Sequence, residues 1–395
     1  VGTANSYIGI FIIMFSIISS GMVSVMTQNI GAGRPGVAYQ ARQLGLLFNA
    51  VAGVLMAVFL FSGAGAILRM VGIADALYEP ALIYLKIVGG GCILNAVIPI
   101  FSSYLRAFGY TKQPLYATIV GNIANFVMNA VFLFVLHKGV AGVAAATVIS
   151  KILNLCIVLY FSHKLISAKN STERIANKTV LGQIVKVGLP SACETALYNV
   201  AMMLVIRFLN QMDAEGLNVT ARSYTATISN FSYCVGAALA QANAIMTGWH
   251  IGAGELEECD RGTKRAAFVG VCVAVCMETA IVLGSGFIMP LFTDNPEMTA
   301  LVRKLLAIDI VLEIGRVTNL VFGQALKTSG DAVFPAVIAA VFMFVFAVGG
   351  TWLFGISMGL MAVGAYIGLA SDECVRAVGM VWRWKTGKWR TKKLV

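Results

Sequence analysis

Charged residues are scarce in this 395-residue chain: only 12% of the residues are Asp, Glu, Lys or Arg, about half the fraction in an ordinary soluble domain. Together with 58% apolar residues, this excludes a water-soluble globule, a disordered chain and a collagen repeat. The eight cysteines lack the paired spacing of a zinc site, and we interpret them as small hydrophobic residues. The sequence therefore predicts no metal centre and no disulfide scaffold.

Motifs for nucleotide binding and catalysis are also missing. The chain has no GxxxxGK[ST] phosphate-binding loop, and therefore no ATP site of that type. Gly31–Gly36 matches GxGxxG and Gly355–Gly359 matches GxSxG, but both motifs need a preceding β-strand, and here each joins two apolar segments. His137, His163 and His250 lie at the ends of apolar runs, which leaves no intramembrane histidine as a base. We do not expect an enzyme, and an integral-membrane enzyme is a disfavoured alternative.

Long apolar runs, by contrast, follow one another along the whole chain. A bilayer core about 30 Å thick requires roughly 20 apolar residues in a spanning helix. Breaking the chain at Gly, Pro and charge clusters gives eleven candidate helices, at 2–29, 36–64, 77–107, 112–136, 140–166, 181–212, 218–250, 256–288, 297–327, 332–354 and 358–384. The sequence thus predicts an all-α polytopic membrane protein.

Basic residues are distributed unevenly between the two sets of loops. If successive loops alternate sides, 19 of the 29 Lys and Arg lie on one side and six on the other. The positive-inside rule makes the richer side cytoplasmic, so we expect a multi-pass protein of the cell's inner (plasma) membrane with a cytoplasmic C-terminus. Trp382, Trp384 and Trp389 in the basic tail are expected at the lipid headgroups. The net charge of +11 thus indicates orientation and not nucleic-acid binding.

Two sequence matches share one offset. Ile30–Gly33 recurs as Ile251–Gly254, and Leu105–Gly109 recurs in altered form as Leu326–Gly330, both 221 residues later. A looser match of Gly139 with Gly359 has an offset of 220. The offset covers six predicted helices, an even number, so it predicts two homologous lobes related by an axis along the membrane normal.

The repeat defines the domain organisation. We assign residues 1–166 to an N-terminal lobe, 167–180 to a cytoplasmic inter-lobe linker, and 181–395 to a C-terminal lobe with the basic tail. The C-terminal lobe has one more helix before the point that aligns with Val1. We therefore expect five helices in the first lobe, six in the second and twelve in the full protein. The first lobe should then have a groove at the place of its first helix.

Short motifs in a fixed order give the chain a family resemblance. They are IGAG after the first predicted span, YLRAFGYTKQP, GLPSACE, a second IGAG, LEIGRVTN, GD-x-x-x-P and the tail SDECVRAVGMVWRWKTGKW. Over nearly its whole length the chain resembles the multidrug and toxic compound extrusion (MATE) transporters, and its last helix is similar to that of a clostridial-type branch. The resemblance implies two six-helix bundles around a central cavity that opens alternately to each side of the membrane.

Acidic residues at bilayer depth are concentrated in the second lobe. They are Glu194, Glu278, Asp309, Glu313, Asp372 and Glu373. Only Arg316 and Arg376 are expected at the same depth, because Arg222 and Lys327 are assigned to loops, so the predicted surplus is four acids. Surplus carboxylates in a membrane must be protonated, bind a cation or face water. This pattern is typical of proton-coupled, sodium-coupled or cation transport.

The most concentrated group lies on the predicted helix 297–327. Asp309, Glu313, Arg316 and Asn319 follow one another at spacings of four and three, which places them on one helical stripe. One interpretation is a structural ion pair of Glu313 with Arg316, with Asp309 at the outer surface. The other is that the stripe faces the cavity and keeps a spare carboxylate for substrate or ion. The MATE resemblance implies cavity acids on this helix and favours the second interpretation.

The sequence also suggests places for four other charged residues of the second lobe. Glu194 lies four residues after Pro190, and the resemblance implies a cavity carboxylate on this helix. Asp372 and Arg376 are spaced as a structural pair. Glu278 lies alone among apolar residues, and a protonated residue that faces lipid is one interpretation of it.

In the first lobe Asn122 and Asn125 lie one helical step apart, and either interhelical hydrogen bonds or a place in the cavity would explain them. The sequence does not decide whether Glu278, Lys86 and Lys151 face lipid or protein.

These observations and the resemblance together predict a secondary-active antiporter that exports amphipathic, cationic organic compounds or drugs in exchange for H⁺ or Na⁺. We expect small organic cations and the lipid bilayer as partners, a monomeric state, and no cofactor beyond the coupling ion. A lipid or lipid-linked oligosaccharide flippase of the same superfamily is the alternative. The predicted acid surplus argues against it, since such flippases tend to have a cationic cavity.

Overall fold

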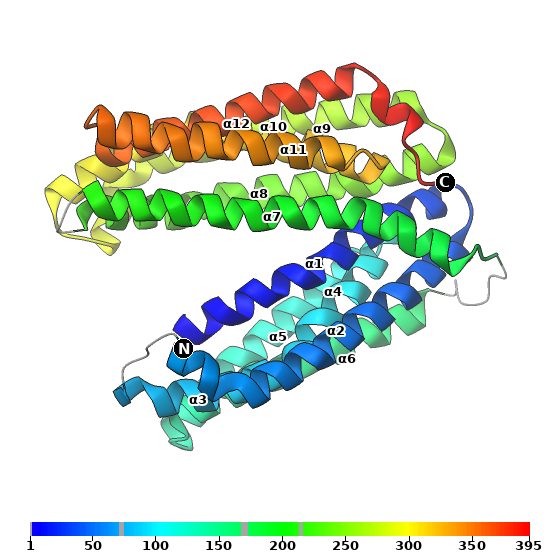
Figure 1. Ribbon diagram of the computed structural model, residues 1–395, viewed down its shortest axis with the longest axis horizontal. Coiled ribbons are helices and arrows are strands. Elements are labelled where there is room, and N and C mark those ends of the chain that lie inside the picture. Colours follow the sequence, from blue (N-terminus) through cyan, green and yellow to red (C-terminus); the bar gives the residue numbers. More distant parts are fainter. Residues whose placement is uncertain (1, 71–74, 167–172, 213–215) are drawn as a thin grey trace. The chain divides into compact units, whose positions relative to one another are not determined.

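The computed structural model describes the chain except residues 1, 71–74, 167–172 and 213–215. The described residues are almost entirely helical and contain no strand (Figure 1). They form two compact units, Val1–Ala192 and Cys193–Val395. Part of the predicted linker, 167–172, lies outside the described residues.

The first unit contains six α-helices and the beginning of a seventh. They are α1 (Gly2–Gly31), α2 (Pro35–Met70), α3 (Asp75–Gly90), α4 (Cys92–Ala107), α5 (Lys112–Ala130), which continues as a π-helix over Val131–Val135, and α6 (Gly139–Leu165). Helices α3 and α4 correspond to the single predicted span 77–107, which Gly91 interrupts.

The second unit begins within α7 (Asn177–Met212). It continues with α8 (Leu217–Ala253), α9 (Leu256–Ile288), α10 (Pro296–Ser329), α11 (Val333–Phe342) and α12 (Met361–Lys385). Two π-helical stretches, Met343–Val348 and Thr351–Ser357, extend α11 toward α12. Each of the eleven predicted spans is present as a helical segment in the described part of the chain, and the all-α prediction is confirmed.

Seven helical segments are long and apolar enough to cross a membrane, counted over the described residues. Helices α8, α10 and α12 are not among them. Their mean hydropathy is lowered by buried polar and charged residues, which form the site described below. Because these polar residues are buried inside the protein, the three helices can still lie in the bilayer.

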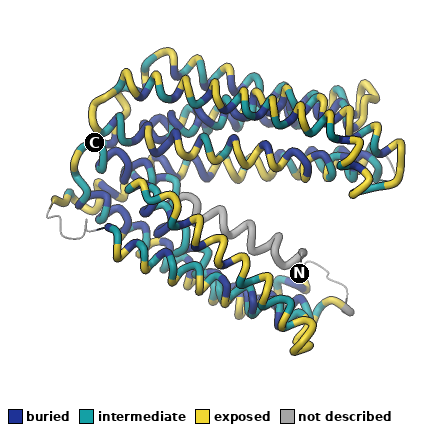
Figure 2. Tube along the Cα trace, turned by 180° about the vertical axis from the view of Figure 1, so that it is seen from behind, coloured by how far each residue is buried: buried dark blue, intermediate teal, exposed yellow. Residues whose placement is uncertain are grey.

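The outer surface of the helices is apolar. Phe126 and Phe134 along α5, and Leu283 and Phe287 along α9, each expose more than 70% of their surface. Figure 2 shows exposed residues along the length of the helices and not only at their ends. Exposed large apolar residues on this scale require a lipid environment.

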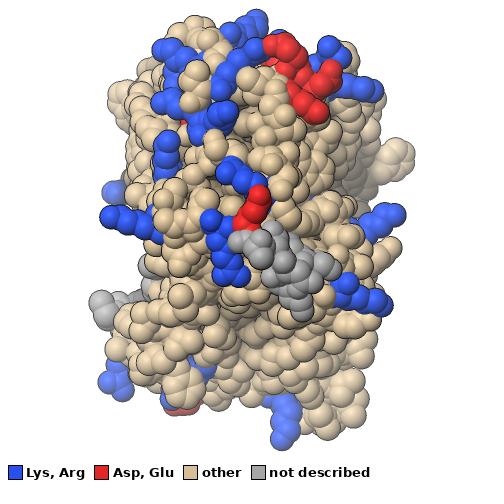
Figure 3. All heavy atoms as spheres, turned by 90° about the vertical axis from the view of Figure 1, so that its right-hand side faces the viewer, with Lys and Arg blue, Asp and Glu red and all other residues tan. Residues whose placement is uncertain are grey.

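Lys and Arg side chains greatly outnumber Asp and Glu side chains at the end of the molecule that Figure 3 shows. The assignment of the basic side to the cytoplasm stays a prediction.

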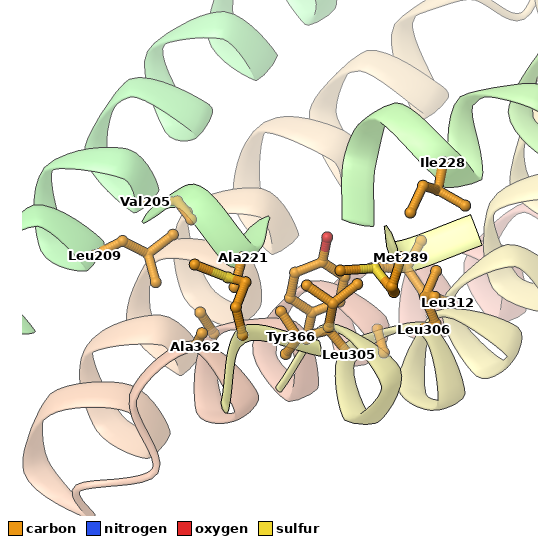
Figure 4. Close-up of a cluster of buried hydrophobic side chains, with 14 residues drawn as sticks. Val205, Leu209, Ala221, Ile228, Met289, Leu305, Leu306, Leu312, Ala362 and Tyr366 are labelled. Atoms are coloured by element: carbon orange, nitrogen blue, oxygen red, sulfur yellow. The ribbon is translucent and has the colours of Figure 1, made fainter. Parts of the chain in front are cut away.

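The largest apolar cluster of the second unit lies between α7, α8, α10 and α12. Figure 4 shows side chains from these helices pointing toward one another, among them Val205, Ile228, Leu305 and Tyr366. Tyr366 also lines the larger cavity of this unit. The cluster therefore packs directly against the wall of the site.

A glycine allows α10 and α12 to approach closely. A Cβ atom on Gly315 would lie 2.7 Å from the backbone nitrogen of Cys374, closer than packed atoms can come. The absence of a side chain at this position brings Arg316 on α10 beside Glu373 on α12. The charged groups of the two helices meet as a result.

The C-terminal tail is folded against the second unit. Trp384 and Trp389 are each only 1% exposed and stack with ring centroids 4.2 Å apart. The Trp384 indole N–H donates to Asp260 at the start of α9 at 2.7 Å. The prediction of headgroup anchoring is wrong for these two residues, because a turn at Gly387, whose φ is +68°, returns the tail to the protein. Only Trp382 of the three is exposed, at 58%.

Candidate functional site

The acid and amide stripe on α10 is buried in the second unit. Asp309 and Glu313 are almost completely inaccessible, and Asn319 is 8% exposed. Arg316 forms an ion pair with Glu313, and its Nε lies 3.7 Å from Glu373 Oε1 on α12. Asn319 donates to Glu373 at 3.0 Å. Arg316 is therefore placed between one carboxylate of its own helix and one of its neighbour.

Asp309 is the spare carboxylate of the stripe. Within the described chain it forms no ion pair, and its Oδ2 accepts no hydrogen bond. Its side chain lines the larger cavity instead of the molecular surface. The interpretation that Asp309 reaches the outer surface is therefore wrong. Glu313, in contrast, is fully buried and lines neither cavity of the second unit described below.

On α12 the spacing of Asp372 and Arg376 produces the expected pair. The guanidinium of Arg376 donates from Nη2 at 2.7 Å and from Nε at 3.0 Å to the two carboxylate oxygens of Asp372. The same Nη2 lies 2.9 Å from Glu373. Arg376 thus neutralises one acid bidentately and contributes to a second, which is a structural arrangement.

Glu194 on α7 has a partner that the sequence did not predict. Lys327 Nζ lies 2.7 Å from Glu194 Oε2, and both side chains are largely buried. The assignment of Lys327 to a loop is wrong, since it belongs to the last turns of α10. Its position, eleven residues or about three turns after Arg316, continues the charged stripe, and this periodicity could have identified it.

Two cavities adjoin these groups. The larger has a volume of about 330 Å³ and is lined by Tyr198, Met202, Arg222, Ala226, Ser229, Asn230, Tyr233, Asp309, Leu312, Arg316, Tyr366, Leu369, Asp372 and Glu373. The smaller, of about 270 Å³, is lined by Glu194, Thr195, Tyr198, Tyr233, Arg316, Asn319, Leu320, Gln324, Lys327, Met343, Glu373 and Arg376. Four residues, Tyr198, Tyr233, Arg316 and Glu373, line both, so the cavities share a wall. Their volumes are near the lower end for small-molecule pockets.

The two cavities differ in charge. The larger has three acidic and two basic residues in its wall, and the smaller has two acidic and three basic residues. Arg222, assigned from the sequence to a loop, lies on α8 and lines the larger cavity. With Arg222 and Lys327 included, the predicted surplus of four acids falls to two. The two acids that form no ion pair in the described chain are Asp309, in the wall of the larger cavity, and Glu278, which is buried close to it.

Tyrosines are the main residues that the sequence interpretation missed. Tyr198, Tyr233 and Tyr366 line the larger cavity, and the Arg316 guanidinium lies 5.7 Å from the ring centroid of Tyr233. Tyr198 follows Glu194 by one helical turn, so the spacing from an acidic position could have indicated it. Aromatic faces can bind organic cations as they bind the guanidinium here.

The first-unit candidates form a separate polar group. Asn122 and Asn125 line a cavity of about 200 Å³ between α5 and α6, together with Lys151. Asn125 donates to Ser150 at 3.3 Å, and Lys151 donates to Asn95 at 2.7 Å. Both expected roles of the asparagines, interhelical hydrogen bonding and cavity lining, are thus compatible with the structure.

The surroundings of three residues that the sequence left open are now known. Lys86 is exposed on α3, whereas Lys151 faces the protein. Glu278 on α9 is 0% exposed, so the interpretation as a lipid-facing residue is wrong.

Comparisons with known proteins agree with this architecture. A family model described as MatE matches residues 1–131 and 190–353. The chain is 31% identical to the uncharacterized transporter YisQ of Bacillus subtilis (strain 168), over 99% of this chain and 87% of YisQ.

Solved structures share the fold at lower identity. One, described as the outward-facing conformation of a multidrug resistance MATE family transporter of the MOP superfamily, has a TM-score of 0.89 at 20% identity and covers 98% of this chain and 87% of its own. Another, a MOP superfamily transporter from Pyrococcus furiosus described by the reverse polarity of its binding pocket, has a TM-score of 0.82 at 20% identity over the same shares of the two chains.

Proposed function

The chain belongs to the MatE family of membrane transporters, and from this premise we propose that it is a secondary-active antiporter that exports amphipathic organic cations in exchange for H⁺ or Na⁺. Family membership points to a transporter. The substrate class, the coupling ion and the direction of transport are the proposed part.

One observation carries the proposal: the surplus of buried acid next to the larger cavity of the second unit. Asp309 lines that cavity and has one buried carboxylate oxygen without a hydrogen-bond partner, and the buried acids Glu278 and Glu313 lie close to it. Ionised acids without counterions are very unfavourable at this depth, so the region attracts a proton, a metal cation or a cationic substrate. These species would compete for the same negative charge, and such competition couples their movements.

The lining of the larger cavity suits an amphipathic cation. Tyr198, Tyr233 and Tyr366 provide aromatic surface, and Met202 and Leu369 provide apolar surface. A cationic group near Asp309 would have its charge balanced, while its hydrophobic part would contact the rings. We propose that Asp309 and the three tyrosines bind substrate, and that the paired groups Asp372 and Arg376 hold the wall in place.

The first-unit asparagines are proposed as a second contact surface. Asn122 and Asn125 offer neutral donors and acceptors in a polar cavity. No acidic residue lines that cavity, so the two asparagines would form hydrogen bonds with a substrate but would not balance its positive charge.

Transport by reconstituted protein tests this function. Vesicles containing the wild type should export a fluorescent organic cation such as ethidium when an ion gradient is imposed. Asp309→Asn should reduce this transport at least tenfold, because the amide keeps the size of the side chain but loses its charge. Asp294→Asn, the same change at an exposed position, is the matched control and should transport normally. Wild-type rates in the Asp309→Asn vesicles would contradict the proposal.

A lipid flippase is a second candidate, and one observation favours it. The smaller cavity has three basic residues, Arg316, Lys327 and Arg376, which could bind an anionic headgroup. All three are already paired with acids, however, which reduces their availability. A fluorescent anionic lipid in the same vesicles distinguishes the two functions: the antiporter should leave its distribution between leaflets unchanged.

We also propose that the protein works as a monomer in the plasma membrane with its C-terminal tail in the cytoplasm. The basic bias of the loops supports this orientation.

A further inference from the structure

The polar cavity of the first unit contains a lysine but no acid. It has a volume of about 200 Å³, and apart from Gly121 every residue of its wall has a polar side chain: Asn122, Asn125, Thr147, Ser150, Lys151 and Asn154. All of them belong to α5 or α6. The cavity therefore combines one cationic group with neutral amides and hydroxyls.

Lys151 lies near the middle of a membrane-spanning helix. It is twelve residues from the first residue of α6, Gly139, and fourteen from the last, Leu165, which places it about 20 Å from either end. Helix α6 is long and apolar enough to cross a bilayer core about 30 Å thick. An ammonium group at this depth is unfavourable unless an anion or a polar cavity surrounds it.

No acidic side chain of the first unit balances this charge. The unit has only three acidic residues in its sequence, Asp75, Glu79 and Glu173, and none of them belongs to α4, α5 or α6. Among the described residues Lys151 takes part in no ion pair, and its Nζ donates one hydrogen bond, to Asn95 Oδ1 on α4 at 2.7 Å. An ammonium group has three N–H donors, so two of them remain for a ligand.

A second residue of the wall is also incompletely hydrogen-bonded. Asn154 follows Lys151 by three residues on α6, so the two side chains are neighbours on one face of the helix. The Oδ1 atom of Asn154 is buried and accepts no hydrogen bond from any residue the structure describes. Buried polar atoms without partners are rare in folded proteins. A half-turn of the amide exchanges its oxygen and nitrogen, so Asn154 can offer either group to a ligand.

We propose that this cavity binds a small organic carboxylate, whose oxygens accept hydrogen bonds from Lys151 and from the amides of the wall. The carboxylate supplies the negative charge that the first unit itself does not place beside Lys151. Hydrogen bonds between an ammonium and a carboxylate are among the stronger ones in proteins. The volume is below the usual range of pockets for drug-sized ligands, so the cavity suits an acid with few atoms.

A bound carboxylate would also change how the cavity receives a cation, and this step rests on the proposed transport function. The charge of Lys151 repels a cationic substrate from Asn122 and Asn125 in the same wall. A carboxylate beside Lys151 cancels that repulsion, so the acid and the organic cation would bind the first unit together. Binding of the acid alone does not depend on transport.

Thermal unfolding of the purified protein in detergent tests the binding. Sodium propionate should raise the melting temperature of the wild type above that in sodium chloride at equal ionic strength, since a ligand of the folded state stabilises it. Propionamide has nearly the same shape without the charge and should cause no rise. Equal melting temperatures in propionate and chloride would overturn the site.

Replacement of Lys151 shows whether the rise comes from this cavity. Lys151→Met keeps an unbranched side chain of similar length without the ammonium group, and it should abolish the rise. Because the change removes an unbalanced charge, the variant should melt no lower than the wild type in chloride. Lys86→Met, the same change at an exposed position on α3, is the matched control and should preserve the rise. A full rise in Lys151→Met would contradict the proposal.

A second variant keeps the lysine and supplies the missing charge. Asn154→Asp places a carboxylate one turn from Lys151 on the same helix, where the two can pair. It should raise the melting temperature in chloride and abolish the further rise in propionate. Stabilisation of Asn154→Asp by propionate to the same extent as the wild type would contradict a site centred on Lys151.

The two proposals can fail separately. Stabilisation by propionate without export of organic cations retains this site and removes the proposed function. Export of organic cations by a protein that propionate does not stabilise removes this site alone.

Discussion

Replacement of Arg376 should destabilise the second unit strongly. Its side chain is 4% exposed and donates to Asp372 at 2.7 to 3.1 Å while lying 2.9 Å from Glu373. Arg376→Gln leaves Asp372 buried without a cation, and removal of one partner of a buried pair costs about 3 to 5 kcal/mol. The carboxylate of Glu373 should be destabilised less than that of Asp372, because Asn319 and Arg316 remain close to it. The unfolding equilibrium should therefore shift by more than about 100-fold.

The double variant Asp372→Asn/Arg376→Gln separates loss of charge balance from loss of packing. It removes the uncompensated carboxylate, so it should recover at least half of the lost unfolding free energy. Unfolding in mixed detergent micelles, followed by tryptophan fluorescence, measures both variants. Arg261→Gln, which breaks an exposed pair with Glu258, is the control and should change stability by less than about 0.5 kcal/mol. A loss below about 1 kcal/mol in Arg376→Gln, or a double variant no more stable than the single one, would refute this reasoning.

Three further variants test other parts of the structure. Trp389→Ala should cost about 3 to 5 kcal/mol in the same unfolding assay, because the ring is fully buried, whereas exposed Trp382→Ala should cost less than about 1 kcal/mol. Gly315→Val should force α10 and α12 apart, lowering stability by about 1 to 3 kcal/mol and reducing vesicle transport. Lys327→Gln should leave Glu194 buried without its cation and lower the melting temperature, and Glu194→Gln in the same chain should restore part of it.

Helix positions could be predicted from the sequence because long apolar runs and their breaks are local features. The charged stripe of α10 could be predicted for the same reason: Asp309, Glu313 and Arg316 lie on one helix at helical spacing. Contacts between positions on one helix depend only on its geometry. The pair of Asp372 with Arg376 follows the same rule.

Contacts between helices were harder to predict. Helix α9 is apolar around most of its circumference, so its sequence does not show that Glu278 faces α10 instead of lipid. Lys327 and Arg222 lie where apolar runs weaken, and hydropathy alone assigned them to loops. Trp384 and Trp389 are buried because Gly387 turns the tail back, which is a tertiary feature. In each case the deciding information is the rotation of a helix or the path of a turn.

Export of a fluorescent organic cation from vesicles, with Na⁺ and pH gradients imposed one at a time, tests the central claim most directly. An inward gradient of the coupling ion alone should drive export against the substrate gradient, and dissipation of that gradient with an ionophore should stop it. Vesicles in which neither gradient accelerates export beyond that of protein-free vesicles would contradict the account.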